Sequence, residues 1–270
     1  MKVLIYINHA KIESERVFNE LKACLSSNNI KFTCIDNEDL KNKSKVEGYS
    51  VIFSIGGDGT ILGLTEFALL NNLPIIGINI GKVGFLTEFE PECISQAVKM
   101  LIDGSLKKDA RSVLKISYQN KCYFALNDLV VQRLYKDNIA GHVINLSVCL
   151  DGENADNITG DGVIVSTPTG STAYSLAAGG PVLAPGINAF SLTPISAHSL
   201  HNRPIIFSAD SKCEVKVLSG DAGLFIDGKL VSLISEGASV SVVAYKNKTV
   251  FLRKSNSNFY KKLIGKLNRV

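Results

Sequence analysis

Charged residues are missing from the stretch between Gly162 and Asn202, which contains no Lys, Arg, Asp or Glu. An uncharged stretch could suit a membrane, but this one holds four prolines and many Gly, Ser and Thr residues, which a lipid-exposed helix tolerates poorly. We therefore predict buried strands, loops and one short helix here, and no membrane partner. The N-terminal run M-K-V-L-I-Y-I-N-H has too short an apolar part for a signal peptide and predicts a first strand.

The cysteines do not form a C-x-x-C motif, although there are six of them, at positions 24, 34, 93, 122, 149 and 213. Most lie in apolar runs such as L-S-V-C-L, so buried free thiols in a reducing cytoplasm explain them best. The net charge of +4 suits anionic small molecules and lacks the concentrated basic face of a nucleic-acid binder. We expect a cytoplasmic protein without a nucleic-acid partner.

Residues 1–104 alternate between apolar strands and helices, which predicts an α/β domain with a mostly parallel sheet covered on both faces. The predicted strands are K-V-L-I-Y-I-N, K-F-T-C-I, V-I-F-S-I and P-I-I-G-I-N-I. Helical spacing covers 11–27, a second helix is expected to open at Thr60, and a third is expected to run from Pro91 to about Asp103.

Residues 105–252 contain successive strand-like runs, which predict a β-rich, sandwich-like domain. Asp-Gly pairs at 151–152 and 227–228 are typical of hairpin turns. The last segment, 253–270, returns to helical spacing in F-Y-K-K-L-I-G-K-L. We expect this segment to pack back on the first domain.

The run V-I-F-S-I-G-G-D-G-T, residues 51–60, joins a strand to a helix through a glycine-rich loop. Unpaired N–H groups at a positive helix terminus bind phosphate, and glycine lets phosphate approach the backbone, so Gly56, Gly57, Gly59 and Thr60 are a candidate phosphate loop. A tight structural turn is the alternative. Asp58 in the middle of the loop is unexpected, because its carboxylate is ionised at neutral pH and repels phosphate.

Two nucleotide-binding readings of this loop are disfavoured. A dehydrogenase fingerprint could use the glycines, but it expects an acidic residue about 20 positions further on, where the sequence reads G-I-N-I-G-K. There is also no Walker sequence and no protein-kinase H-R-D. A phosphotransferase can use the carboxylate, which accepts a hydroxyl proton or helps to hold a metal ion.

G-G-D-G-T resembles the signature shared by NAD kinases, lipid kinases of the diacylglycerol and sphingosine type, and phosphofructokinases. The run T-P-T-G-S-T-A-Y-S-L-A-A-G-G-P at 167–181 resembles the NAD kinase signature at nearly every position. The remaining motifs of that family follow in order: G-K-V-G-F-L at 81–86, A-L-N-D at 125–128, G-D-G-V-I-V-S at 160–166, H-S-L-H-N-R-P at 198–204 and F-I-D-G at 225–228. The chain is identified as a member of the NAD kinase family, of the bacterial type.

The resemblance implies transfer of the terminal phosphoryl group of ATP, or of polyphosphate in some members, to the adenosine 2′-hydroxyl of NAD. Asp58 would be the general base. No His, Cys or acid cluster suggests a protein-held transition metal, so the expected metal is Mg²⁺ held mainly by substrate phosphates. The resemblance also implies a homodimer or homotetramer. A lipid kinase, which would lack the 167–181 run, and a non-catalytic NAD(P) sensor are the alternatives.

The resemblance assigns a set of residues to the NAD site. They are Asp58, Gly59, Phe85, Asn127, Asp128, His142, Thr159, Asp161, Thr172, Ala173, Tyr174, Ser175, Leu176, Ala177 and Lys229. Three of them depart from common family patterns: Asp128 replaces Glu, Thr159 replaces a basic residue of some relatives, and Lys229 replaces Gln. The last two bear on the choice between NAD and NADH.

Overall fold

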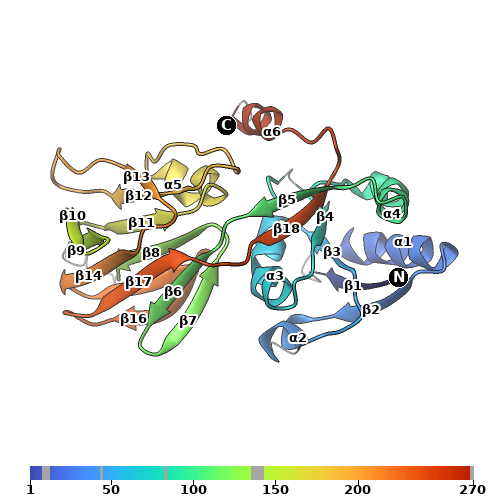
Figure 1. Ribbon diagram of the computed structural model, residues 1–270, viewed down its shortest axis with the longest axis horizontal. Helices are drawn as coiled ribbons and strands as arrows, with labels where there is room; N and C mark the ends of the chain where they lie inside the picture. Colours follow the sequence, from blue (N-terminus) through green and yellow to red (C-terminus); the bar gives the residue numbers. More distant parts are fainter. Residues whose placement is uncertain (8–12, 43–44, 82–83, 135–142, 268–270) are drawn as a thin grey trace. The chain divides into compact units, whose positions relative to one another are not determined.

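The computed structural model describes residues 1–7, 13–42, 45–81, 84–134 and 143–267 (Figure 1). The chain divides into two units, Met1–Ala110 with Thr249–Val270, and Arg111–Lys248. The sequence placed the divisions at 104/105 and 252/253. The units differ at both boundaries because strands at 107–111 and 249–253 join the sheet of the first unit.

The first unit is built on a six-stranded sheet with the order β2-β1-β3-β4-β18-β5, in which β1 pairs in parallel with β2 and β3, and β4 with β3 and β18. Its strands are β1 (Lys2–Ile7), β2 (Lys31–Ile35), β3 (Val51–Gly56), β4 (Ile75–Asn79), β5 (Lys107–Arg111) and β18 (Thr249–Arg253). Strand β3 is buried along its whole length, as the apolar run V-I-F-S-I requires of a strand covered on both faces. The predicted parallel sheet is confirmed.

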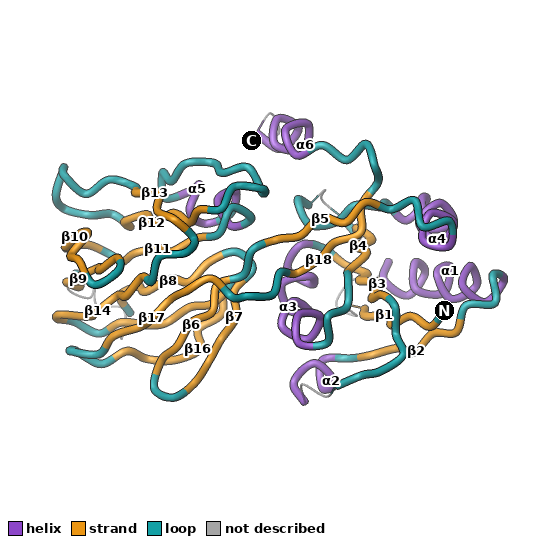
Figure 2. Tube along the Cα trace, viewed as in Figure 1, coloured by secondary structure: helices purple, strands orange, loops and turns teal. Residues whose placement is uncertain are grey.

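The helices of the first unit are α1 (Glu13–Ser27), α2 (Asn37–Asn42), α3 (Asp58–Leu70), the short 3₁₀ helix η1 (Pro91–Cys93), α4 (Ile94–Ile102) and α6 (Phe259–Leu267). Helices α1 and α4 lie side by side (Figure 2), and Val17 and Leu21 of α1 pack with Phe53 of β3 in one apolar core. Helix α3 begins at Asp58, so the prediction that Thr60 opens it was wrong by two residues. Gly57 takes the N-cap position without a side-chain cap hydrogen bond, which leaves no N-cap signal for the sequence to display.

The C-terminal helix α6 packs on the first unit, as expected. The Lys262 ammonium donates a hydrogen bond to the Thr87 carbonyl oxygen at 2.9 Å, and the Phe259 ring lies 6.2 Å from the Phe85 ring, centroid to centroid.

The second unit contains two six-stranded sheets, ordered β10-β9-β14-β17-β6-β7 and β13-β12-β11-β8-β15-β16. The strands are β6 (Leu114–Tyr118), β7 (Lys121–Ala125), β8 (Asp128–Arg133), β9 (Ile144–Leu150), β10 (Glu153–Gly160), β11 (Gly162–Ser166), β12 (Ala189–Ile195), β13 (Ile205–Ser208), β14 (Cys213–Ser219), β15 (Ala222–Ile226), β16 (Lys229–Ile234) and β17 (Ser239–Ala244). Val148 and Val215 of one sheet share a buried cluster with Val131 and Leu192 of the other. The predicted sandwich is confirmed.

Both predicted hairpin turns are present. Asp151 and Gly152 connect β9 to β10 with φ values of 52° and 89°, and Asp227 and Gly228 connect β15 to β16 with 46° and 79°. Two consecutive left-handed residues are what a type I′ hairpin turn needs.

The uncharged stretch contains β11, the 3₁₀ helix η2 (Gly170–Thr172), the short helix α5 (Tyr174–Ala177) and β12, in agreement with the prediction. Within the part of the chain that the structure describes, no helix is both long and apolar enough to cross a membrane.

All six cysteines are free, but the expectation that they are buried was wrong for Cys34 and Cys122. These two thiols are exposed because β2 and β7 are edge strands of their sheets. Only Cys213 is fully buried, and that burial raises the pKa of its thiol to about 12.

Candidate functional site

The carboxylate of Asp58 is held by a row of backbone N–H groups. Strand β3 ends at Gly56 and α3 starts at Asp58, so the side chain lies at the carboxyl end of the parallel sheet. Its Oδ2 accepts the N–H of Phe85 at 2.7 Å, and its Oδ1 accepts the N–H groups of Leu86 and Thr87 at 3.0 and 3.4 Å. These bonds fix the orientation of the carboxylate.

Two glycines of the expected motifs have a steric role near this carboxylate. A Cβ on Gly84 would overlap the Asp58 carboxylate, and one on Gly56 would overlap the Thr60 side chain. By contrast, Gly59 faces open space on the first turn of α3. The loop therefore combines the hydrogen-bonded carboxylate of Asp58 with the open, positive N-terminus of α3, where an anion can approach.

In the second unit, three sequence motifs meet at one edge of a sheet. In the pairing register, Ser166 at the end of β11 faces Asp128 at the start of β8, and Ile226 at the end of β15 faces Leu129. The Thr167 hydroxyl donates to the Leu126 carbonyl oxygen at 2.6 Å. The A-L-N-D, T-P-T-G-S-T and F-I-D-G segments are thus side by side, although several strands separate them in the sequence.

Asp227 binds the A-L-N-D segment, a role that the sequence did not reveal. Its carboxylate accepts the N–H groups of Leu126, Asn127 and Asp128 at 2.9, 2.8 and 3.1 Å. The only sequence signal was the Asp-Gly turn, which explains a hairpin without these contacts. Asp227 thereby fixes the backbone from which the Asn127 and Asp128 side chains project.

Asp128 and Asp227 form a coupled carboxyl pair. Burial raises the pKa of Asp128 to about 7, with a further contribution from the charge of Asp227. Burial also raises the pKa of Asp227, but its three N–H donors oppose that rise. We therefore assign the negative charge of the pair to Asp227 and the shared proton, near neutral pH, to Asp128.

The expected NAD-site residues of the 167–181 run lie on η2 and α5, next to this edge. Ser175 is buried and its hydroxyl bonds to that of Thr193 at 3.0 Å, whereas Tyr174 is 39% exposed and leaves its ring accessible. Thr172, Ala173 and Leu176 are partly buried and Ala177 is exposed. Lys229, also exposed, follows the Asp227-Gly228 turn at the same edge.

Two expected NAD-site residues lie at the opposite end of the same strands. Asp161 precedes β11 and forms an ion pair with Arg133 at 2.9 Å, and the Thr159 hydroxyl donates to Asn145 at 2.6 Å. On β11, Gly162 faces Gln132 and Ser166 faces Asp128, and the four residue steps between Gly162 and Ser166 span about 13 Å. Within one chain, Thr159 and Asp161 are therefore not beside Asn127 and Asp128. His142 lies outside the described residues.

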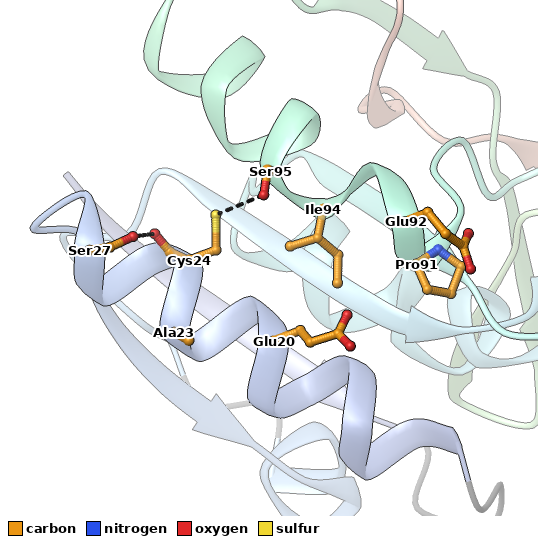
Figure 3. A pocket seen from close by; sticks show the side chains of 8 residues that line it. All are labelled: Glu20, Ala23, Cys24, Ser27, Pro91, Glu92, Ile94 and Ser95. Atoms are coloured by element: carbon orange, nitrogen blue, oxygen red, sulfur yellow. Dashed lines mark hydrogen bonds between the residues drawn. The ribbon is translucent and has the colours of Figure 1, made fainter.

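Figure 3 shows a groove elsewhere in the first unit, with a volume of about 510 Å³. It is lined by Glu20, Ala23, Cys24, Ser27, Pro91, Glu92, Ile94 and Ser95. None of these residues belongs to the motifs described above. Among the described residues, no group of three or more His, Cys, Asp or Glu side chains gathers to hold a metal ion.

A carboxylate fixed beside an open helix terminus is an arrangement typical of phosphotransferases that act on a hydroxyl group. The models of the ATP-NAD kinase N-terminal and C-terminal domains match residues 3–106 and 126–254. The chain belongs to the NAD kinase family.

Individual proteins support this assignment. The chain is 32% identical to the NAD kinase of Caldicellulosiruptor saccharolyticus, with 99% of each chain covered. It resembles the crystal structure of yeast NADH kinase complexed with NADH, with a TM-score of 0.84, 26% identity and coverage of 99% of this chain and 87% of the yeast chain. It also resembles an Archaeoglobus fulgidus NAD kinase in complex with ATP, with a TM-score of 0.78, 25% identity and coverage of 100% and 99%.

We predict that Gly84→Ala abolishes most activity while the protein stays folded. The added methyl group overlaps the Asp58 carboxylate and displaces it, and a shift of about 1 Å at a reacting group costs on the order of 10²-fold in rate. The measurement is kcat with ATP and NAD. Gly265→Ala, on α6 with open space around it, is the matched control and should keep its activity. Full activity of Gly84→Ala would contradict the assigned position of the carboxylate.

We also predict a pH-dependent stability difference between the wild type and Asp128→Asn. The raised pKa of Asp128 stabilises the folded state at low pH, and this contribution is lost as the pH rises from about 4 towards about 7. Relative to Asp128→Asn, the wild type should lose on the order of a few kcal/mol over this range. Urea unfolding at several pH values measures it. The exposed Asp210→Asn should follow the wild type, and parallel curves for wild type and Asp128→Asn would contradict the protonation assignment.

Proposed function

We propose that this chain transfers the terminal phosphoryl group of ATP to the adenosine 2′-hydroxyl of NAD, with Asp58 as the general base. As a member of the NAD kinase family, it is an enzyme that phosphorylates NAD in an ATP-dependent reaction. The proposal concerns the acceptor hydroxyl, the base and the residues that bind NAD.

The main support for the proposal is the Asp58 carboxylate, which backbone N–H groups hold in place. As the 2′-oxygen forms its bond to the terminal phosphorus, the bond from that phosphorus to the bridging oxygen breaks and ADP leaves. The hydroxyl proton goes to a carboxylate oxygen of Asp58. Because the N–H groups of residues 85–87 hold this side chain, it needs little reorganisation to accept the proton.

The NAD-binding part of the proposal rests on the edge of the sandwich sheet where the motifs meet. Asn127 offers an amide, and Asp128 offers a carboxyl group that exchanges a proton near neutral pH, so both suit adenine edges and ribose hydroxyls. The accessible Tyr174 ring can stack on a flat base. The remaining expected contacts come from Gly59, Phe85 and the 172–177 run.

The donor set near Asp58 fits a magnesium ion held mainly by substrate. Both oxygens of the only carboxylate in the loop already accept N–H groups, so the loop offers few free oxygen ligands. Mg²⁺ usually keeps few protein ligands and binds phosphate oxygens instead. Bound there, it would neutralise phosphate charge, and Asp58 would be the residue of the loop that could help to hold it.

We further propose a homodimer or homotetramer in the cytoplasm. Thr159 and Asp161 lie at the end of the strands opposite to Asn127 and Asp128, and a second copy of the chain could bring these two residues to the site. Six free cysteines, two of them exposed, favour a reducing compartment. The same site could also use polyphosphate as the donor and NADH as the acceptor.

The two alternative functions are disfavoured by separate observations. A lipid kinase would share G-G-D-G-T but would not match the NAD kinase C-terminal model over 126–254. An NAD(P) sensor would gain nothing from a carboxylate fixed beside the phosphate loop.

We predict that Asp58→Asn still binds NAD but makes NADP at least about 10²-fold more slowly, because an amide cannot accept the hydroxyl proton. Isothermal titration with NAD and an assay of NADP formation separate the two effects. The exposed Asp103→Asn, in the same unit, is the control. Turnover of Asp58→Asn near that of the wild type would refute Asp58 as the base.

A further inference from the structure

The charge of Asp58 poses a problem for the proposed reaction, because the donor brings several negative phosphate oxygens to an ionised carboxylate. Two like charges about 4 Å apart repel each other strongly at the intermediate dielectric of a protein surface, so a nearby cation matters. The motifs of the glycine loop supply no Lys or Arg to residues 51–60. A cation reaches this position from the other end of the chain.

Lys266, on the last turn of α6, lies beside the carboxylate. Its Nζ is 3.8 Å from Oδ2 of Asp58 and 4.2 Å from the centroid of the Phe85 ring. Phe85 is also the residue whose N–H donates to the same Oδ2. The Lys266 side chain thus passes over the Phe85 ring toward the Asp58 carboxylate.

Helix α6 is held in place by a buried ion cluster. The Glu88 carboxylate accepts hydrogen bonds from Arg253 at 3.0 Å and from Lys262 at 2.7 Å, and the side chains of Glu88 and Arg253 are each only 5% exposed. Burial alone would raise the pKa of Glu88, but Lys262 and Arg253 outweigh it and the pKa is lowered. The cluster is therefore ionic at neutral pH, and removing one partner of such a buried pair is costly.

The segment 85–88 connects this cluster to Asp58. Its N–H groups bind the Asp58 carboxylate, while the carbonyl oxygens of Phe85 and Thr87 accept hydrogen bonds from Arg253 and Lys262. One face of the segment positions Asp58 and the other anchors α6. The proximity of Lys266 to Asp58 is consequently fixed by the fold of the first unit and not by the weak 3.8 Å contact itself.

We propose that Lys266 is a phosphate-binding residue of the phosphoryl-transfer site. Without substrate its ammonium balances the charge of Asp58, and when the donor binds it contacts an oxygen of the terminal phosphate. The side chains of Lys266 and Asp58 are 33% and 29% exposed, so both are accessible to a ligand. A partly exposed ion pair is weak, so a phosphate oxygen can replace Asp58 as the partner of Lys266 at little cost in free energy. This inference rests on the proposed function of Asp58.

The test compares Lys266→Met with Lys266→Arg and with Lys261→Met. Lys261 is an exposed lysine of the same helix, so its variant removes the same charge away from Asp58. For Lys266→Met we expect about tenfold weaker binding of the magnesium complex of AMP-PNP, measured by titration, which corresponds to about 1.4 kcal/mol. The KM for ATP should rise and kcat should fall, while the KM for NAD and the melting temperature stay unchanged. Lys266→Arg should recover part of the loss, and Lys261→Met should equal the wild type.

Other results would contradict the proposal. Unchanged AMP-PNP binding by Lys266→Met, or a loss equal to that of Lys261→Met, would remove Lys266 from the donor site. Faster turnover would mean that Lys266 restrains Asp58, and a change confined to the KM for NAD would place it on the acceptor side. A result that refutes the role of Lys266 can be distinguished from a result that refutes the proposed function. A wild-type-like Lys266→Met with an inactive Asp58→Asn refutes only the former, and an active Asp58→Asn refutes the base.

Discussion

The hydrogen bonds between one carboxylate and three consecutive backbone N–H groups organise the glycine loop of this protein. Asp58 accepts the N–H groups of residues 85–87, and this requires a glycine at position 84 and an ordered 85–88 segment. That order in turn depends on Arg253 and Lys262, which bind its carbonyl oxygens. The C-terminal helix therefore belongs to the same structural unit as the glycine loop, although the two segments are far apart in the sequence.

The second unit uses the same device for a different purpose. Asp227 accepts the N–H groups of residues 126–128 and fixes the backbone that presents Asn127 and Asp128. Asp58 is partly exposed and open to a reacting group, whereas Asp227 is enclosed by the turn and the segment it binds. Burial raises the pKa of its neighbour Asp128 and keeps a proton on it, whereas the three N–H donors stabilise the negative charge of Asp227. One hydrogen-bonding pattern thus gives a proposed base in one unit and a scaffold in the other.

Local signals in the sequence predicted most of the fold and only part of the site. Fully apolar runs predicted the parallel sheet, and the Asp-Gly pairs predicted both hairpins, because these features depend on neighbouring residues. The start of α3 was missed because Gly57 caps it without a side chain. The roles of Asp227 and Lys266 were missed because their partners are distant in the sequence. The exposure of Cys34 and Cys122 was missed because only the complete sheet order shows which strands are edge strands. Sequence motifs identified the family, whereas long-range contacts between these motifs had to come from the structure.

The proposed reaction phosphorylates the 2′-hydroxyl of the adenosine in NAD. The most direct measurement incubates the purified protein with ATP, Mg²⁺ and either NAD or its 2′-deoxyadenosine analogue, and follows phosphate in the product by ³¹P NMR. We expect a 2′-phosphomonoester from NAD, which a dehydrogenase specific for NADP accepts, and no phosphorylated product from the analogue. A phosphorylated analogue, or no product from NAD, would contradict it.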